Sequence, residues 1–460
     1  MSNITLKQAA AWCGGFVEEK YENVEFLGAN NDTRTLCPGQ LFVALQGARD
    51  GNDFIPAAME KGAAAVLCSR RMGDYPAILV EDTRIALGQI AAGERRRLGM
   101  KVIGITGSVG KSTTKEMVAS VLETTFRTAK TPVNHNNDIG MPMAILAMPE
   151  DTQVAVLEMG MNHFGEMAYL SGIGRPDLAV IVNIGTAHIE FLGSVEGIRQ
   201  AKMEITQGMG PDGLLFLNGD DAMLCSLPEK PIQRVRYFGT AEGCVCRCDS
   251  IRQEEGVLRF RVTRGDASFP VEMKLEGRHF VSDAMAAIAV GLELGVAPSS
   301  IQRALAAFQN LSGRQETFQR CGFTFIKDCY NAGPESMEAA LRVLGERKGR
   351  RIAVLGDMLE LGERASAEHF RVGRIAAERV DWVLCCGPNA PKTVRGCLTG
   401  GMPDTRALAF PDQTALLCEL QRIARPGDVM LFKGSRGMHM ETILDAFLNY
   451  LKDLNGGDSQ

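Results

Sequence analysis

The residues best suited to chemistry form a short stretch that could hold a nucleoside triphosphate. Gly107 and Gly110 bracket a turn that leads into Lys111-Ser112. Glycines let backbone N–H groups close around phosphate oxygens, and a following helix adds the favourable dipole of its N-terminus. The lysine can reach the β- and γ-phosphates, and the serine hydroxyl can bind Mg²⁺. The pattern predicts a nucleotide site, although the strict P-loop motif has glycine where this chain has Ile105.

Three single residues are further candidates for metal or phosphate chemistry. Glu158 follows the apolar segment 154–157, and a carboxylate there can bind a Mg²⁺ already held by a serine and by phosphate oxygens. His188 comes just after the next apolar segment, and spacing alone leaves it open between a structural and a functional role. From composition, Lys202 resembles an ordinary lysine on the surface of a helix.

Two clusters of like residues have simpler explanations beside the chemical ones. The amide-rich segment 131–138 could contact phosphate or sugar, but asparagines also build turns. Cys244, Cys246 and Cys248 alternate, so we expect them on one face of a strand. The Cys-x-x-Cys spacing of zinc sites is absent, so we interpret them as small apolar residues.

The elements that must position these residues alternate between strand and helix. Residues 102–105 are β-branched or small, which favours a buried strand, and apolar residues at helical spacing follow Lys111. Further apolar runs at 154–157, 178–184 and 214–217 alternate with helical segments. This order predicts a mostly parallel sheet with helices on both faces, and ligands bind at the carboxyl ends of such strands.

Segments on either side of this region indicate three α/β units. Residues 1–98 mix short strands and helices, and residues 99–312 hold the glycine turn and its sheet. Within the second unit, residues 233–275 predict a small antiparallel appendage. Residues 313–460 resume the alternation, with strands expected at 323–326, 352–355, 383–385 and 429–432.

Composition excludes several classes of protein. The chain has 460 residues, enough for about three domains of ~150 residues each. A net charge of −5 gives no sign of a surface for nucleic acid or anionic membrane. Thirteen scattered cysteines, no apolar core of a signal peptide and no run long enough to span a bilayer lead us to expect a cytoplasmic protein with reduced thiols.

Ten segments, taken together and in order, resemble the Mur ligase family. They are Asp32-Thr33-Arg34, 104–113, 134–140, 158–160, 183–188, Ala201-Lys202, 277–279, 328–331, 354–362 and 433–436. The match covers nearly the whole chain. Within the family it is closest to the enzymes that add D-alanyl-D-alanine to UDP-N-acetylmuramoyl-tripeptide.

The resemblance implies a three-domain ATP-dependent ligase that forms an amide bond through an acyl phosphate and releases ADP. The first domain would bind the UDP-sugar peptide, the second would bind ATP, and the third would close over it. The family pattern implies a monomer and gives ATP contacts to Gly107, Ser108, Val109, Gly110, Lys111, Ser112, Thr113, Asn137, His279, Asp283, Arg314 and Asp328. Here His279 and Asp283 would line the adenine pocket, Asp328 would contact ribose, and Arg314 would face the phosphates.

The resemblance also implies two Mg²⁺ ions and changes the interpretation of Lys202. Ser112 and Glu158 would hold one ion, and Glu158, His188 and a carbamate on Lys202 would hold the second. Reaction with CO₂ turns the cationic amine of a lysine into an anionic ligand. Together with Lys111, the three residues Glu158, His188 and Lys202 are the expected catalytic residues.

Departures from the family pattern and alternatives to the assignment remain. Phe280 and Asp283 stand where the family often has Asn, and Gly333 replaces another Asn. The alternatives are the ligase that adds the third, diamino, residue of the peptide, a folylpolyglutamate synthetase, and a regulatory P-loop NTPase. Some ligases of the first kind carry an Asp-Asn-Pro-Arg motif, which is missing from this chain. The identity of the third residue of the tripeptide is left open.

Overall fold

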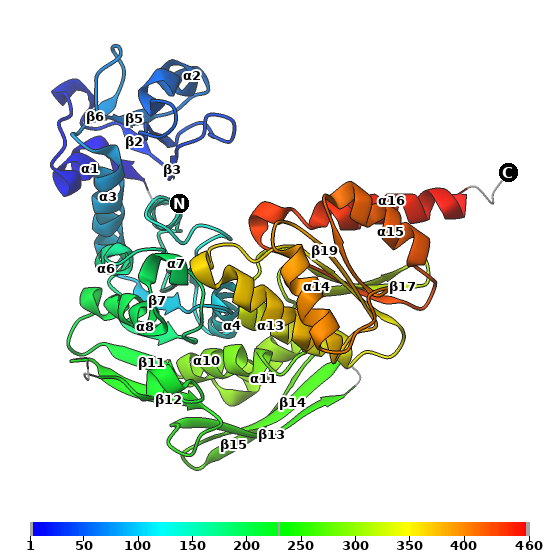
Figure 1. Ribbon diagram of the computed structural model, residues 1–460. Helices are drawn as coiled ribbons and strands as arrows, with labels where there is room; N and C mark the ends of the chain where they lie inside the picture. The colour runs from blue at the N-terminus through cyan, green and yellow to red at the C-terminus, as the bar shows by residue number, and fades with distance from the viewer. Residues whose placement is uncertain (1–2, 229–230, 255, 457–460) are drawn as a thin grey trace.

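The computed structural model describes residues 3–228, 231–254 and 256–456, and its main sheets lie in three units along the chain (Figure 1). The described residues form sheets of two, four, nine and six strands, of which the larger three are parallel in all or most of their pairings. The predicted α/β class with mostly parallel sheets is confirmed.

The first unit contains a small parallel sheet beside a two-stranded antiparallel sheet. Its strands are β1 (Ile4–Thr5), β2 (Glu25–Phe26), β3 (Ala29–Asn30), β4 (Leu41–Val43), β5 (Ala65–Cys68) and β6 (Ala77–Leu79), and its helices are α1 (Leu6–Cys13), α2 (Ile55–Glu60) and α3 (Thr83–Leu98). Asp82 caps α3 by accepting hydrogen bonds from the N–H groups of Arg84 and Ile85. Helix α3 ends at Gly99, whose φ of 62° favours glycine. It joins the first unit to the second through a continuous apolar core.

The second unit contains the nine-stranded sheet, ordered β15-β14-β13-β12-β11-β10-β7-β9-β8. Its strands are β7 (Lys101–Thr106), β8 (Thr128–Lys130), β9 (Val154–Glu158), β10 (Leu178–Ile181), β11 (Leu214–Asn218), β12 (Arg234–Gly239), β13 (Cys246–Glu254), β14 (Val257–Arg264) and β15 (Ala267–Met273). Its helices are α4 (Lys111–Glu123), α5 (Gly140–Leu146), α6 (Glu166–Gly174), α7 (Ile189–Leu192), α8 (Val195–Met203), α9 (Ala222–Cys225), α10 (Phe280–Glu293) and α11 (Pro298–Ala307). Alternate residues of β7, β9 and β10 face two separate cores, with α3, α5, α6 and α8 on one side and α4, α10 and α11 on the other.

The antiparallel segment differs in one respect from the expected appendage. Strands β14 and β15 pair antiparallel across Gly265, as predicted. However, β13 pairs with β12 in parallel, so the antiparallel strands extend the main sheet. Cys246 and Cys248 lie in the apolar core as interpreted, whereas Cys244 precedes β13. Among the described residues there is no group of three His, Cys, Asp or Glu side chains placed to hold a metal.

The third unit is a six-stranded sheet between two layers of helices. Its strands are β16 (Glu316–Arg320), β17 (Phe323–Asp328), β18 (Arg351–Leu355), β19 (Trp382–Cys386), β20 (Ala407–Phe410) and β21 (Val429–Lys433). Its helices are α12 (Pro334–Gly345), α13 (Ala365–Ala377), α14 (Ala390–Thr399), α15 (Gln413–Ile423) and α16 (Glu441–Gly456). Helices α12, α13 and α14 cover one face, and α15 and α16 cover the other. The four strands expected here are confirmed, and only β16 is antiparallel.

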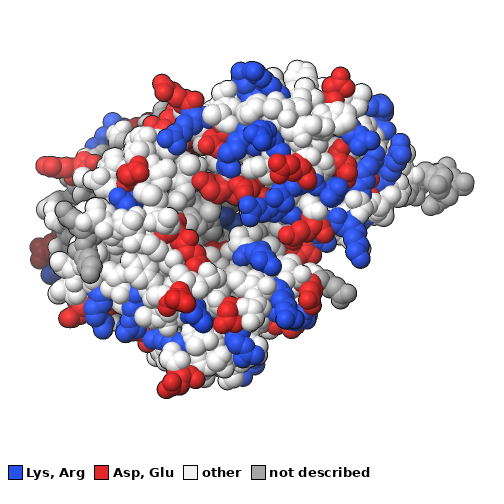
Figure 2. All heavy atoms as spheres, turned by 60° about the horizontal axis from the view of Figure 1, so that its bottom comes forward, with Lys and Arg blue, Asp and Glu red and all other residues white. Residues whose placement is uncertain are grey.

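The surface carries both signs of charge. On the face shown in Figure 2, Lys and Arg side chains lie intermixed with Asp and Glu, and no broad area has one sign. No described helix has the length and apolar character needed to cross a bilayer.

Candidate active site

The largest group of predicted site residues meets at one edge of the nine-stranded sheet. Strands β9, β7, β10 and β11 are neighbours there, and a cavity of about 680 Å³ lies between their carboxyl ends and the third unit. The predicted residues that line it are Ser108, Val109, Gly110, Lys111, Ser112, Thr113, Asn137, Glu158, His188, His279, Asp283, Arg314 and Asp328. Only Gly107 and Lys202 of the predicted set do not line the cavity.

The glycine loop is held closed by contacts that the sequence did not indicate. The side-chain oxygen of Asn183 accepts hydrogen bonds from the N–H groups of Ser108 and Val109, each at 3.0 Å. The Lys111 ammonium donates to the carbonyl oxygens of Gly107 and Ser108 at 2.8 and 3.3 Å. Gly110 has a φ of 82° just before α4, a conformation that a side chain would strain. Asn183 therefore fixes the shape of the loop that would surround phosphate oxygens.

Lys202 lies beneath the glycine loop, out of contact with solvent. It is 1% exposed, and its Nζ donates to the carbonyl oxygen of Gly107 at 3.0 Å. Burial lowers the pKa of this amine well below its usual value, and the nearby Lys111 charge lowers it further. A buried lysine without a carboxylate partner is favoured as the neutral amine. The lysine that resembled a surface residue by composition is therefore buried next to the predicted phosphate site.

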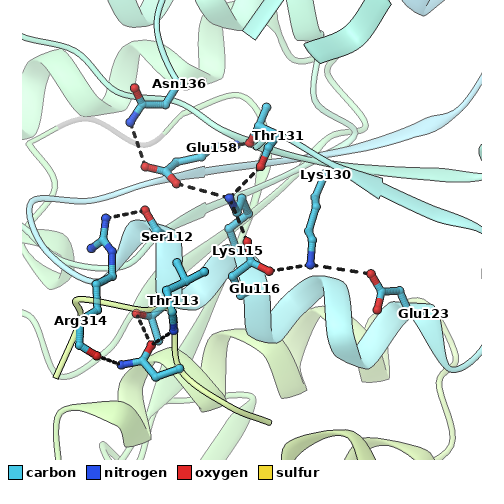
Figure 3. Close-up of polar contacts among 12 residues, drawn as sticks. Ser112, Thr113, Lys115, Glu116, Glu123, Lys130, Thr131, Asn136, Glu158 and Arg314 are labelled. Atoms are coloured by element: carbon cyan, nitrogen blue, oxygen red, sulfur yellow. Dashed lines mark hydrogen bonds and ion pairs between the residues drawn. The ribbon is translucent and has the colours of Figure 1, made fainter. Parts of the chain in front are cut away.

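Glu158 and Ser112 bring hard oxygen atoms to the same part of the cavity (Figure 3). Oε1 of Glu158 accepts a hydrogen bond from Asn136 at 2.9 Å. Its other oxygen, Oε2, is buried and accepts no hydrogen bond within the described part of the chain. The Ser112 hydroxyl accepts a hydrogen bond from Arg314 at 2.9 Å. A buried carboxylate oxygen without a donor, beside a hydroxyl, fits the oxygen ligands that Mg²⁺ prefers.

His188 is held from the third unit. Its Nδ1 lies 2.8 Å from Oε2 of Glu360, which follows β18. This contact holds the pKa of the Glu360 carboxyl below its usual range. His188 has a φ of 64°, and Glu360 has a φ of 62°. Since Glu360 occupies Nδ1, the other ring nitrogen, Nε2, remains for a ligand.

The two acidic residues assigned to nucleoside contacts have protein partners. Asp283 lies against Gly110 and accepts a hydrogen bond from the Thr114 hydroxyl at 2.7 Å. Burial raises the pKa of the Asp283 carboxyl to about 7. Asp328 forms an ion pair with the buried Lys433 at 2.7 Å.

The remaining assigned residues have mixed surroundings. Asn137 accepts hydrogen bonds from the N–H groups of Ile139 and Gly140 at the start of α5, so its side chain builds a turn as well as lining the cavity. His279 starts α10 with its ring 4.2 Å from the ring of Phe280. Phe280 is buried in the core, where an asparagine would have no polar partner on the apolar side of α10.

The third unit closes the cavity through several polar contacts. Arg314 lies 3.9 Å from the centre of the Tyr330 ring, while its guanidinium binds Ser112. Glu335, in the first turn of α12, accepts hydrogen bonds from the Thr186 N–H and hydroxyl at 2.9 and 3.0 Å. Arg314 was predicted here, but Glu335 was not, because its partner is about 150 residues away along the chain and nothing in its own sequence marks the contact.

Two protein-family models match this chain, and the boundary between them lies between the nine-stranded and the six-stranded sheet. Residues 105–291 match the model for the Mur ligase middle domain, and residues 313–436 match the model for the Mur ligase, glutamate ligase domain. The two matches together span more than half of the 460 residues.

Individual relatives match over nearly the full length. The UDP-N-acetylmuramoyl-tripeptide–D-alanyl-D-alanine ligase of Bacillus subtilis (strain 168) is 39% identical over 94% of this chain and 95% of its own. A crystal structure of MurF from Acinetobacter baumannii has a TM-score of 0.89 at 32% identity, covering 98% and 99%. The structure of MurF ligase from Thermotoga maritima in complex with ADP has a TM-score of 0.81 at 30% identity, covering 93% and 98%. These matches confirm the resemblance seen in the ten sequence segments, and the chain belongs to the Mur ligase family.

Proposed function

We propose that this protein is an ATP-dependent ligase that joins D-alanyl-D-alanine to UDP-N-acetylmuramoyl-tripeptide and so makes the pentapeptide precursor of peptidoglycan. The observation that carries the proposal is the full-length match to relatives named for this reaction. The glycine loop, Lys111 and Arg314 at one cavity are the groups that such a reaction needs. ATP as the nucleotide is supported by the ADP complex of the Thermotoga maritima relative.

The reaction has two steps, and the chain's main task is to hold three substrates in line. The terminal carboxylate of the tripeptide attacks the γ-phosphorus of ATP, the bond to the β-phosphate oxygen breaks, and ADP leaves. The amine of D-alanyl-D-alanine then attacks the acyl phosphate, loses a proton and expels inorganic phosphate. Lys111 and Arg314 stabilise the negative charge that develops on the transferred phosphoryl oxygens.

Magnesium completes this set of charges. Ser112 and Glu158 would hold one ion, and Glu158, His188 and a carbamate on Lys202 would hold a second. Bound Mg²⁺ neutralises phosphate charge and supplies a positive charge where the tetrahedral intermediate is negative. The hydrogen-bond-free Oε2 of Glu158 supports the first site.

Carbamylation of Lys202 is supported by its surroundings. Attack on CO₂ needs the neutral amine, and burial together with the Lys111 charge favours that form. A new N–C bond forms, and the nitrogen loses one proton, so the side chain gains a negative charge. That charge would compensate Lys111, which shares the Gly107 carbonyl with Lys202.

We assign a different substrate to each of the three domains. Residues 1–98 would bind the UDP-sugar peptide, 99–312 would bind ATP, and 313–460 would close over ATP and receive the dipeptide. Closure over the cavity would exclude the water that hydrolyses an acyl phosphate. We assign the enzyme to the cytoplasm as a monomer without a nucleic-acid partner, in line with its net charge of −5.

The test is phosphate release from ATP and Mg²⁺ with defined acceptors. We expect release only when UDP-N-acetylmuramoyl-tripeptide and D-alanyl-D-alanine are both present. Release with UDP-N-acetylmuramoyl-dipeptide and a single diamino acid would instead assign the ligase for the third residue. A protein that hydrolyses ATP slowly and ignores every acceptor would point to the regulatory NTPase.

A further inference from the structure

A second buried lysine, Lys115, lies behind Glu158 and takes no part in the mechanism described above. It is in the second turn of α4, and its side chain is fully buried. Its Nζ donates to the carbonyl oxygen of Thr131 at 2.7 Å and lies 3.0 Å from Oε1 of Glu116. Figure 3 shows this ammonium group between α4 and the end of β9, pointing toward Glu158.

Lys115 reaches Glu158 by two routes. Its Nζ lies 3.9 Å from Oε2 of Glu158, the oxygen that accepts no hydrogen bond. Indirectly, the lysine binds the Thr131 carbonyl, and the Thr131 hydroxyl accepts the backbone N–H of Glu158 at 3.0 Å. Asn136, five residues further along the same segment, donates to Oε1 at 2.9 Å. One cation thus connects α4, the segment 131–136 and both the backbone and the carboxylate of Glu158.

On the side away from Glu158, Lys115 contacts a second carboxylate, that of Glu116. Glu116 lies between Lys115 and the half-exposed Lys130, whose Nζ is 2.5 Å from Oε2 of Glu116. Glu116 therefore shares its charge between two lysines, whereas Lys115 also lies 3.9 Å from the Glu158 carboxylate. A buried cation that is itself held by several partners restricts the neighbouring carboxylate to one rotamer.

We propose that Lys115 is the positioning residue for the metal-binding carboxylate Glu158. The inference rests on the proposed function, because it assumes that Glu158 binds the divalent ion that accompanies the nucleotide. Lys115 does not line the cavity, so it would not touch a bound nucleotide. It acts by holding Glu158 in place. If instead its charge mainly repelled a metal, removing it would strengthen metal binding, so the two effects have opposite signs.

The experiment measures Mn²⁺ binding to the protein–ADP complex by electron paramagnetic resonance, with ADP affinity measured separately in EDTA. Mn²⁺ replaces Mg²⁺ at oxygen-ligand sites. In Lys115→Met we expect the Mn²⁺ affinity to fall about 10-fold or more, with unchanged ADP affinity in EDTA, because losing an outer partner of a metal ligand costs 10–100-fold in affinity. The Mg²⁺ concentration for half-maximal activity should rise by the same factor, while kcat at saturating Mg²⁺ changes less.

Two more variants separate this role from general stability. Lys130→Met removes the outer lysine of the same cluster and should leave Mn²⁺ affinity within about twofold of the wild type. Thr131→Val keeps the carbonyl that Lys115 binds but removes the acceptor of the Glu158 N–H. It should weaken Mn²⁺ binding in the same direction by a smaller factor, and it tests the idea if Lys115→Met does not fold.

Two results would overturn the role proposed for Lys115. Equal or tighter Mn²⁺ binding in Lys115→Met and Thr131→Val, with normal binding in the wild type, overturns the role of Lys115 and leaves the proposed function intact. If the wild type with ADP binds no Mn²⁺, the assignment of Glu158 as a metal ligand fails, and the role of Lys115 fails with it.

Discussion

Two buried lysines lie at the edge of the same sheet in opposite electrostatic surroundings. Lys115 is surrounded by Glu116, Glu158 and the Thr131 carbonyl. The Nζ of Lys202 donates to the Gly107 carbonyl, and its neighbouring charge is the cation Lys111. Both side chains are out of contact with solvent.

The difference explains how two lysines behind one cavity can have unrelated roles. A buried ammonium with carboxylate partners is stabilised as a cation and can hold those partners in place. A buried amine beside another cation is stabilised as the neutral form, which is the reactive form toward CO₂. The residue type is the same, so the surroundings decide whether the lysine organises the site or reacts within it.

The largest effect is expected for Lys202→Ala, which removes the lysine proposed to react with CO₂. We expect ligase activity to fall on the order of 1,000-fold, the scale of losing one electrostatic contributor to the transition state. Short carboxylic acids such as acetate should restore part of it by supplying the missing anion in the space left. Phosphate release with and without acetate measures both effects. A variant that keeps full activity would rule out the carbamate, and Lys115→Ala should not respond to acetate, because an added anion cannot replace a lost cation.

Stability should distinguish the two lysines by sign. Lys115→Met leaves Glu158 buried without its cation, and breaking a buried ion pair costs about 3–4 kcal/mol. Lys202→Met removes an amine whose pKa burial lowers, so the folded state no longer bears the cost of burying a lysine beside another cation. Urea titrations at pH 7 should therefore show a large loss for Lys115→Met and no loss, or a gain, for Lys202→Met. Equal losses would mean that the two environments do not differ as described.

Asp283 offers the same comparison with the sign of the charge reversed. Burial raises its pKa from 3.8 to about 7, and Arg314 is the cation that partly offsets this. The folded state therefore keeps a proton that the unfolded state has lost, so this carboxyl reduces stability as the pH rises from about 4 to 7. Asp283→Asn should remove the effect and be more stable than the wild type by about 2–3 kcal/mol at pH 8.

The difference between the two proteins should shrink as the pH falls toward 3.8, the pKa of the carboxyl in the unfolded chain, because below that pH both states hold the proton. Thermal unfolding of both proteins at pH 4.5, 6 and 8 measures the difference. A gap that stays constant with pH would show that Asp283 does not titrate in this window.

The smallest effect on activity is expected for the contact between α12 of the third unit and the loop after β10. Glu335→Gln weakens the two hydrogen bonds from Thr186, which hold α12 against the loop after β10. Hydrogen bonds to a charged group contribute about 1.5 kcal/mol or more each, but an amide oxygen retains part of this. We expect a KM for ATP raised about fivefold, or ~1 kcal/mol, with little change in kcat.

Glu338→Gln is the matched control for that variant. Glu338 lies one turn further along α12, where its partners are Arg342 and Arg371 of the third unit. Its KM for ATP should equal that of the wild type. A similar rise in both variants would assign the effect to the stability of α12 and not to the contact with Thr186.

Much of the fold followed from local patterns. Apolar runs predicted β7, β9 and β11 to within one or two residues, because a strand buried on both faces needs consecutive apolar side chains. The pairing of β12 with β13 was missed, since only a few residues form it and their own sequence does not specify the partner. The run 178–184 was expected to be one strand, but β10 ends at Ile181. The following residues leave the sheet because Asn183 turns toward the glycine loop.

In the candidate site, too, some residues could be recognised from the local sequence and others could not. Gly107, Gly110, Lys111 and Ser112 could be recognised by type and spacing, because phosphate binding by a loop is a local property of the backbone. Asn183, Glu335 and Glu360 were missed as site residues, since each acts on a partner brought close only by the fold.

The sequence by itself determined the α/β order of elements, the position of the glycine loop and, through ten ordered segments, the family. Composition and spacing gave no sign that Lys115 and Lys202 are buried, and the carbamate role of Lys202 came only from the family resemblance. Only the tertiary structure decided that Lys115 faces two carboxylates and that Lys202 faces a carbonyl and another cation. The energy of a buried charge depends on what surrounds it in three dimensions, and those neighbours come from distant parts of the chain.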